Sequence, residues 1–321
     1  AGYAPSSPVD DSPVEVQMGR QVWQPANYND QYNGEITFAR ALLLSANSAT
    51  VRVSRAIGEN AVIAAARRNG IVSPLTPVPS IALGAEGVTP VELVSAYAPF
   101  ANGGIKVKPR MVTRIEAPDG TLLWSSEMVR TPGAMDPIDA YEITEMLQGV
   151  VNYGTGRTIR DMGVTGAIAG KTGTTNSGED VWFVGFTPTL VAGIWFGYDT
   201  PRQISTNASG GRLAAPAWAE FYQAGWHEPR GSAFVAPAGM VSAVVDPQSG
   251  ELATEWCPSR TRQWFRPGSE PHEECHLHTG PPEAQIAIDA NGNIQINPGA
   301  GDPISRVGRN IGNILRKIIH W

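Results

Sequence analysis

The stretch Ala167–Tyr198, AIAGKTGTTNSGEDVWFVGFTPTLVAGIWFGY, contains three apolar runs separated by turn residues. We predict strands over 167–175, 180–186 and 190–198, because β-branched and aromatic residues bounded by Gly, Pro, Asn and Asp are typical of strands. The short connections between them, including Thr187-Pro188, favour antiparallel pairing. A three-stranded antiparallel meander is therefore expected at the centre of the fold.

Helical patterns lie on both sides of this stretch in the sequence. Residues 36–56 predict two short helices broken at Ser45-Ala46-Asn47-Ser48, because such polar side chains compete for backbone hydrogen bonds. Thr89-Pro90-Val91-Glu92 is a capping box that begins another helix. A long helix is expected over 136–153, and a shorter helix is expected over 214–224. The order of elements predicts an α/β fold of the α+β type, an antiparallel sheet flanked by helices.

The sequence changes character after Trp226. We predict a strand, a turn and a second strand over 241–256, a hairpin at Asn291-Gly292, and an amphipathic helix over 305–321. That helix either packs on its own domain or docks on a partner or an anionic membrane surface. We expect a main domain at 1–228, a small β appendage at 229–280 and a tail at 281–321.

Composition narrows the classes of function. The chain has 321 residues, 42% of them hydrophobic, and a net charge of -6. This hydrophobic content is that of a globular protein. An acidic chain offers no basic field for a phosphate backbone, so we expect no nucleic-acid partner. No apolar run approaches the ~20 residues that span a bilayer, and we predict no cofactor.

The strongest chemical motif is Lys171-Thr172-Gly173, which continues to Thr174. A lysine among small residues at a strand edge offers a fixed cation, hydroxyl donors and open backbone N–H groups. Gly170 and Gly173 let a ligand approach the main chain. The pattern suits an anionic acyl substrate, whereas the alternative is a solvated lysine beside a turn.

Ser45-Ala46-Asn47, at the predicted helix break, is the second motif. A hydroxyl there can transfer a proton, and an amide two residues on can hold a substrate carbonyl. Taken alone, this motif is better explained by helix capping. Together the two motifs match the S-D-N and K-T-G pair of penicillin-binding proteins and class A β-lactamases.

Longer segments carry the same resemblance. They occur in the expected order: TFARALLLSANSATVRV, PSIALGAEGVTPVELVSAYAPFANGG, MLQGVVNYGTGR and GKTGTTNSGEDVWFVGFTP. Residues 1–224 resemble the C-terminal part of the transpeptidase domain of class A, bifunctional penicillin-binding proteins, of the penicilloyl serine transferase and serine β-lactamase-like superfamily. Residues 251–278 resemble a C-terminal extension of that family.

The resemblance implies serine acyl transfer on peptidoglycan stem peptides, with β-lactams trapping the same serine. Ser45 would relay a proton to the leaving amine, and Asn47 would bind the substrate amide. Lys171 would supply a positive field near Ser45. Substrate contacts would come from Thr172, Gly173 and Thr174, with the Thr174 N–H forming half of an oxyanion hole.

One part of the family pattern is missing. The nucleophile and its general base occur as S-x-x-K, but Gly103, Ile105, Ile168 and Ile314 precede the chain's four lysines by three positions. We therefore expect that serine and lysine upstream of Ala1, with the first strands, a glycosyltransferase domain and a membrane anchor. The chain alone is expected to be inactive. The resemblance implies an extracytoplasmic location and contact with other cell-wall synthesis proteins.

Three further functions are compatible with the motifs. Class A β-lactamases activate water with a glutamate, commonly in E-x-x-x-N; that pattern is absent between Asn47 and Lys171, and Ala46 replaces the Asp of S-D-N. Both departures favour a transpeptidase over a β-lactamase-like hydrolase. The second function is that of a D,D-carboxypeptidase, and the third is that of a non-catalytic module that binds peptidoglycan or β-lactams.

Cys257 and Cys275 are the two cysteines of the chain. Their seventeen-residue separation lacks the paired C-x2-C spacing of structural zinc sites, although histidines lie nearby. We predict a disulfide between them and no metal site, with free thiols as the alternative. The extracytoplasmic location implied by the family is compatible with a disulfide.

Overall fold

The structure is a computed structural model that describes residues 2–127, 130–226, 228–229 and 231–280, with the backbone of 285–288 and 294–297. The described residues form two compact units. The first contains residues 2–241 and 264–270, and the second contains most of the remainder from 242 onward.

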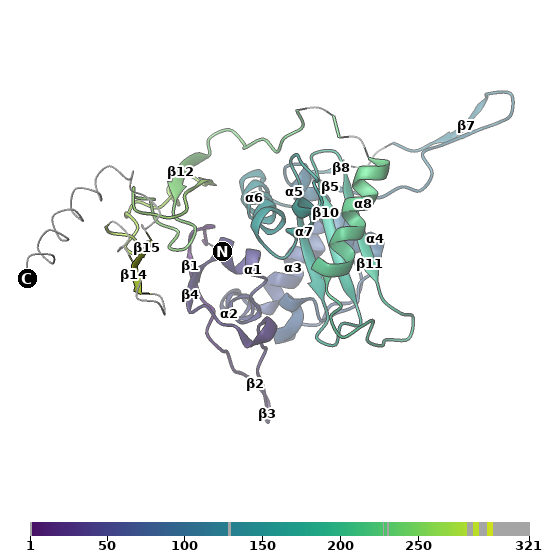
Figure 1. Cartoon of the computed structure of the whole chain (residues 1–321). Helices are drawn as coiled ribbons and strands as arrows, with labels where there is room; N and C mark the ends of the chain where they lie inside the picture. Colours follow the sequence, from purple (N-terminus) through teal and green to yellow (C-terminus); the bar gives the residue numbers. More distant parts are fainter. Residues whose placement is uncertain are drawn as a thin grey trace, which may run out of the picture. The chain divides into compact units, whose positions relative to one another are not determined.

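A three-stranded sheet lies at the centre of the first unit (Figure 1). Its strands are β9 (Ala169–Thr174), β10 (Val181–Phe186) and β11 (Val191–Phe196), in the order β11-β10-β9. Both pairs are antiparallel. The meander expected from the sequence is confirmed, and β9 is an edge strand among the described residues.

Helices cover both faces of this sheet. On one face, Phe183 of β10 packs against Trp218 of α8 (Ala215–Gly225), with ring centroids 5.7 Å apart. On the other, Phe186 meets Phe100 of the short helix α5 (Ala98–Ala101) and Tyr97, which joins α5 to α4 (Pro90–Ala96). The alternation of side chains along β10 thus divides the core into two layers, as the predicted fold class requires.

The long helix α6 (Pro137–Tyr153) contributes to both layers. Its Val151 joins the cluster around Phe183, whereas Leu147 and Val150 join the cluster around Phe186. Asp136 caps its first turn by accepting a hydrogen bond from the Ile138 N–H. The capping box of α4 is also present as predicted.

The backbone of β10 at Gly185 lies very close to the aromatic rings of Phe183 and Trp218. A Cβ atom there would lie 2.7 Å from the Trp218 ring and 2.6 Å from the Phe183 ring. Glycine is therefore the residue that lets α8 pack directly on β10.

The remaining elements of the first unit are short. Helices occur as α1 (Phe38–Leu44), α2 (Asn47–Ile57), α3 (Glu59–Asn69), α7 (Thr158–Asp161) and the single turns η1 (Tyr28–Asp30), η2 (Pro79–Leu83) and η3 (Gly210–Ala214). Antiparallel strand pairs occur as β1 (Pro8–Asp10) with β4 (Glu35–Thr37), β2 (Val16–Met18) with β3 (Gln21–Trp23), β5 (Lys106–Val107) with β8 (Arg130–Thr131), and β6 (Arg114–Glu116) with β7 (Leu122–Ser125). No helix in the described ranges is long and apolar enough to cross a membrane.

The appendage differs from the predicted strand–turn–strand over 241–256. Strand β12 (Val241–Val245) pairs with β13 (Thr261–Phe265), and only a single bridge links Val245 to Leu252 after the predicted turn. Leu252 also forms a bridge to Glu274, and residues 251–256 form no strand. Strands β14 (Gln285–Ile288) and β15 (Ile294–Asn297) pair antiparallel. Asn291-Gly292 and the helix expected over 305–321 lie outside the described residues.

Candidate functional site

Ser45 and Lys171 meet at the free edge of β9. Lys171 Nζ donates a hydrogen bond of 2.7 Å to Ser45 Oγ and one of 3.0 Å to the Thr172 carbonyl. Lys171 comes from the strand, whereas Ser45 lies between α1 and α2. The fold therefore brings the two predicted motifs together.

Ser45 has a backbone conformation that serine rarely adopts. It ends α1 with φ 56° and ψ 44°, in the left-handed region. Glycine is the usual residue at such a helix end, and a non-glycine residue there costs about 1–3 kcal/mol. The side chain at this position is thus retained despite a backbone cost, which points to a role for its hydroxyl.

Desolvation changes the proton affinity of Lys171. The side chain is half-buried, and burial lowers the pKa of Lys171 to about 8. Burial acts in this direction because it disfavours the charged ammonium. At neutral pH the ammonium form still predominates and donates to Ser45, but the group titrates close to the physiological range.

The strand register places backbone donors at the same edge. The Thr175 N–H donates to the Asp180 carbonyl over 3.0 Å, which makes this a hydrogen-bonded pair. Such pairs alternate with non-hydrogen-bonded ones in an antiparallel ladder. Thr172 lies opposite Phe183 and Thr174 lies opposite Val181, and by this alternation both are in non-hydrogen-bonded pairs. Their N–H groups consequently point away from β10, toward the open edge.

The hydroxyls of these two threonines have fixed partners. Thr172 Oγ1 lies 2.6 Å from Thr155 Oγ1, and Thr174 Oγ1 accepts a 3.0 Å hydrogen bond from the Gly210 N–H. A Cβ at Gly210 would lie 2.7 Å from the carbonyl oxygen of Gly173. The loop after α6 and the turn η3 therefore fix the position of the Lys171-Thr172-Gly173 strand.

Asn47 begins α2 and hydrogen-bonds to the N-terminal segment. Its Nδ2 donates to the Ala26 carbonyl over 2.7 Å. The neighbouring Ser48 N–H donates to Asn27 Oδ1 over 3.0 Å, so Asn27 supplies a hydrogen-bond acceptor at the first turn of α2. These contacts fix the polar break on which Ser45 lies.

A buried carboxylate supports this arrangement. Asp11 is 0% exposed, and its two oxygens accept hydrogen bonds of 2.8 Å from the Asn27 and Asn33 side-chain amides. The composition of residues 1–34 suggests a surface segment, and for Asp11 and Asn27 this expectation is wrong. A sequence rich in Pro, Asn and Asp is typical of exposed turns. The burial of Asp11 depends on hydrogen-bond partners that only the folded chain brings to it.

Cys257 and Cys275 are not joined by a disulfide. Both are free and buried. The Thr254 N–H donates to Cys257 Sγ over 3.2 Å, and Cys275 Sγ lies 3.3 Å from His278 Nδ1. Each sulfur atom thus has a polar neighbour in the structure, and the disulfide stays a prediction.

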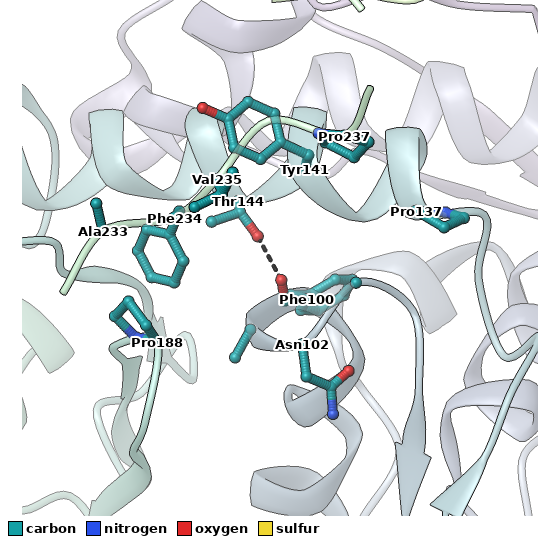
Figure 2. A pocket seen from close by; sticks show the side chains of 12 residues that line it. Phe100, Asn102, Pro137, Tyr141, Thr144, Pro188, Ala233, Phe234, Val235 and Pro237 are labelled. Atoms are coloured by element: carbon teal, nitrogen blue, oxygen red, sulfur yellow. Dashed lines mark hydrogen bonds between the residues drawn. The ribbon is translucent and has the colours of Figure 1, made fainter. Parts of the chain in front are cut away.

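A pocket of about 320 Å³ lies elsewhere in the first unit. Figure 2 shows it between α6, the helix α5 that carries Phe100, and the loops that carry Pro188 and Phe234. One polar contact crosses its wall, a 2.8 Å hydrogen bond from Thr144 Oγ1 to the Phe100 carbonyl. Its lining includes none of the predicted site residues and a single titratable group, Tyr141. The predicted site residues therefore lie outside this pocket.

Comparison with known proteins gives the same assignment. Residues 2–223 match the family described as the penicillin-binding protein transpeptidase domain. Residues 236–280 match the family described as the C-terminal domain of penicillin-binding protein 1A.

Curated relatives are longer than this chain. Penicillin-binding protein 1A of Neisseria meningitidis is 35% identical over 250 residues, which is 75% of this chain and 31% of the relative. Penicillin-binding protein 2D of Bacillus subtilis is 32% identical over 286 residues, or 86% of this chain and 41% of the relative. The chain thus spans less than half the length of these two proteins.

Solved structures share the fold. Penicillin-binding protein 1A from Haemophilus influenzae is similar with a TM-score of 0.78 and 25% identity, covering 85% of this chain and 46% of that one. PonA1 from Mycobacterium tuberculosis, in complex with penicillin V, gives a TM-score of 0.59 and 25% identity, covering 74% and 67%. With the Ser45–Lys171 pair at the edge of the sheet, these similarities establish that the chain belongs to the penicillin-binding protein transpeptidase family.

Proposed function

We propose that this chain supplies one side of the active site of a serine-type D,D-transpeptidase that cross-links peptidoglycan stem peptides. The observation that carries the proposal is the 2.7 Å hydrogen bond between Lys171 and Ser45. It joins a desolvated cation to a hydroxyl at an open strand edge, an arrangement that can accept and return a proton.

In the proposed reaction a serine oxygen attacks the carbonyl carbon of the penultimate D-Ala. The peptide bond to the terminal D-Ala breaks, and an amine of a neighbouring peptidoglycan strand then takes up the acyl group. Ser45 passes a proton to the leaving nitrogen, while the charge of Lys171 favours that transfer. The edge N–H of Thr174 stabilises the oxyanion, a contribution of about 3 kcal/mol for one such donor.

The terminal carboxylate of the substrate would lie beside Lys171, Thr172 and Thr174. A carboxylate there receives hydrogen bonds from hydroxyls and electrostatic attraction from the ammonium group. A β-lactam presents a carboxylate and a reactive carbonyl in a comparable arrangement. The similarity to PonA1, whose structure is a complex with penicillin V, supports β-lactam binding by this domain.

The acyl-accepting serine belongs, in this proposal, to a segment outside the given sequence. None of the chain's lysines follows a serine by three positions, so the S-x-x-K pair does not occur within it. The chain alone is therefore inactive. In the full-length protein we place this domain outside the cytoplasm, with a glycosyltransferase domain, a membrane anchor and contacts to other cell-wall synthesis proteins.

Release of D-Ala from a stem peptide tests the proposal. The full-length gene product should release D-Ala, and Thr172→Val should lower kcat/KM by about tenfold or more, the loss expected for a hydrogen bond to a charged group. Thr113→Val, which changes an exposed threonine, is the matched control and should leave kcat/KM unchanged. Absence of D-Ala release by the folded full-length protein would refute the proposal.

A further inference from the structure

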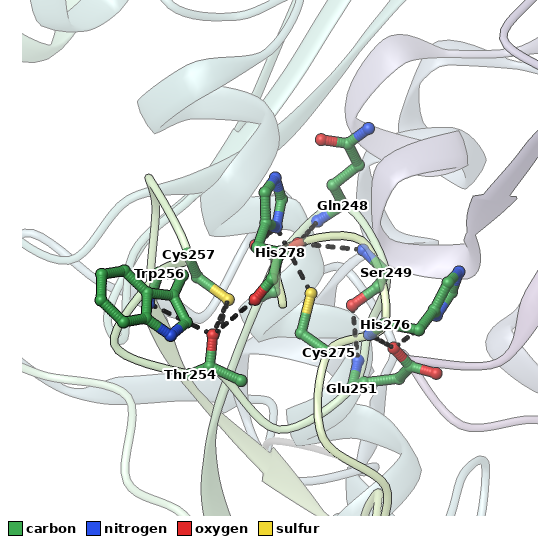
Figure 3. A network of polar contacts seen from close by, with 10 residues as sticks. Gln248, Ser249, Glu251, Thr254, Trp256, Cys257, Cys275, His276 and His278 are labelled. Carbon is green, nitrogen blue, oxygen red and sulfur yellow. Dashed lines mark hydrogen bonds and ion pairs between the residues drawn. The ribbon is translucent and has the colours of Figure 1, made fainter. Parts of the chain in front are cut away.

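Four side chains of metal-ligating types converge in the second unit. They form what we call the four-ligand cluster: Asp246, Cys257, Cys275 and His278. One ligand atom from each lies within 4.8 Å of every other. Figure 3 shows the two sulfur atoms and the His278 ring turned toward a shared space. We propose that the four-ligand cluster binds one structural Zn²⁺ ion.

The spacing of the ligand atoms fits a tetrahedral ion. His278 Nδ1 lies 3.3 Å from Cys275 Sγ and 3.1 Å from Asp246 Oδ2. Zinc bonds of about 2.0 to 2.3 Å place a nitrogen about 3.6 Å from a sulfur ligand and about 3.3 Å from an oxygen ligand. Shifts of a few tenths of an ångström would bring these two pairs to the separations that they take around one ion, and Cys257 Sγ lies within 4.8 Å of the other three ligand atoms.

The ligand types select zinc over the commoner hard cations. Two thiolates and an imidazole are soft or intermediate ligands, whereas Ca²⁺ and Mg²⁺ take oxygen ligands almost exclusively. Four protein ligands complete a tetrahedral shell and leave no position for water or substrate. The cluster therefore fits a structural site and not a catalytic one.

Backbone pairing brings distant parts of the sequence to this point. The Asp246 N–H donates to the Glu251 carbonyl, and the Cys275 N–H donates to the Leu252 carbonyl, each over 2.9 Å. The turn after β12 is thus bonded to the segment that contains Cys275-x-x-His278. This two-residue spacing resembles the close ligand pairs of structural zinc sites. It is a signal in the sequence that the distance between the two cysteines does not reveal.

Hydrogen bonds around the cluster orient its ligands. Asp246 Oδ1 accepts from the N–H groups of Gln248 and Ser249 over 2.8 and 3.0 Å, which leaves Oδ2 for the ion. Thr254 donates its N–H to Cys257 Sγ over 3.2 Å. Two thiolates and one carboxylate leave a net charge of about -1 on a zinc site, and these N–H donors stabilise that charge.

The second unit has little else to stabilise it. Its buried side chains are, among the described residues, Val245, Asp246, Cys257, Gln263 and Cys275. Three of these five belong to the cluster, so ligand atoms occupy the place of an apolar core. Small folds of this kind depend on a metal or a disulfide for stability.

Metal content of the chain as isolated tests the proposal. In this experiment the chain is expressed with secretion into the bacterial periplasm and purified without reductant or chelator. Its zinc content is then measured by mass spectrometry. We expect about one zinc per chain, the stoichiometry of a single four-ligand site, and two thiols that react once the protein is unfolded with a chelator. A disulfide and a zinc content near zero would overturn the proposal.

Single substitutions locate the ion. Cys275→Ser and His278→Gln should each weaken zinc binding by more than about 100-fold, because loss of a ligand exceeds the 10–100-fold effect of losing a supporting contact. His276→Gln is the matched control: this exposed histidine bonds to Glu251 over 2.7 Å and lies outside the cluster. Zinc affinity that is unchanged in the first two variants would overturn the assignment.

A cobalt spectrum of the unaltered chain provides a test that does not depend on the folding of variants. Replacement of zinc by Co²⁺ should produce the intense ligand-field absorption of a tetrahedral site and sulfur-to-cobalt charge-transfer bands. A weak octahedral spectrum without sulfur bands would show that the cysteines are not ligands and would contradict the proposal.

Discussion

Lys171 Nζ lies 2.7 Å from Ser45 Oγ, although 126 positions separate the two residues in the chain. The strand β9 contributes the cation, and the break between α1 and α2 contributes the hydroxyl. Because α6 packs on both α1 and β9, the helix holds the two halves of the site in register. The site is therefore a product of tertiary packing.

Removal of the cation should abolish most of the acylation activity. In the full-length protein, Lys171→Ala should slow acylation by a β-lactam by about 10²–10³, the effect of losing one preorganised electrostatic group. Lys106→Ala, at a lysine of β5, is the control and should acylate at the parent rate. Stopped-flow measurement of acylation separates these outcomes, and equal rates for the two variants would show that Lys171 has no part in the reaction.

The pH dependence of acylation should report the same lysine. Burial lowers the pKa of Lys171 to about 8, so the ammonium form is lost as the pH rises through 8. We expect the second-order acylation rate to fall on that alkaline side. Lys171→Arg should remove the alkaline decline, because guanidinium stays charged. A decline that is unchanged in this variant would assign it to another group.

The Asp11 network should stabilise the first unit strongly. Asp11→Ala removes the hydrogen-bond acceptor of the buried Asn27 amide and of the exposed Asn33 amide. We expect a loss of about 1–3 kcal/mol in the free energy of unfolding, the cost of one unsatisfied buried donor. Asp199→Ala, at an exposed aspartate, should stay within about 0.5 kcal/mol of the parent. Urea titration measures both.

A half-buried carboxyl on α6, that of Glu145, should make stability fall with rising pH. Glu145 accepts a hydrogen bond from the Trp264 N–H over 3.0 Å, yet desolvation raises the pKa of Glu145 to about 7. Burial also raises the pKa of the neighbouring Glu142. Between the unfolded pKa near 4.5 and the folded value, the folded state binds more protons. The free energy of unfolding should therefore decrease from pH 5 to pH 8.

Substitution separates this effect from general titration of the chain. Glu145→Gln should flatten the decrease between pH 5 and pH 8, because the amide has no proton to lose. Glu220→Gln, which changes an exposed glutamate on α8, should keep the slope of the parent. A slope that Glu145→Gln leaves intact would place the titrating group elsewhere.

Local patterns in the sequence predict much of the fold. The capping box at Thr89, the helix break at Ser45 and the three strands of the meander each depend on residues close together in the chain, and each is found where expected. The pairing of β12 with β13 depends on a partner beyond the predicted turn. Periodicity alone does not identify such partners.

The functional residues also divide into those that local sequence patterns predict and those that depend on distant parts of the chain. Ser45 and Lys171 are identifiable from the sequence because each lies in a short motif, but the role of Asp11 depends on amides sixteen and twenty-two positions away. The four-ligand cluster likewise combines Asp246 and Cys257 with a distant Cys-x-x-His pair. Spacing between the cysteines alone favours a disulfide because it takes no account of the carboxylate and the imidazole.

Intact-mass spectrometry after incubation with penicillin tests the central claim most directly. The full-length protein should gain one penicilloyl group on a serine of an S-x-x-K motif outside residues 1–321, and the isolated chain should gain none. A covalent adduct on Ser45 or any other serine of the isolated chain, or the absence of an adduct on the folded full-length protein, would contradict the account.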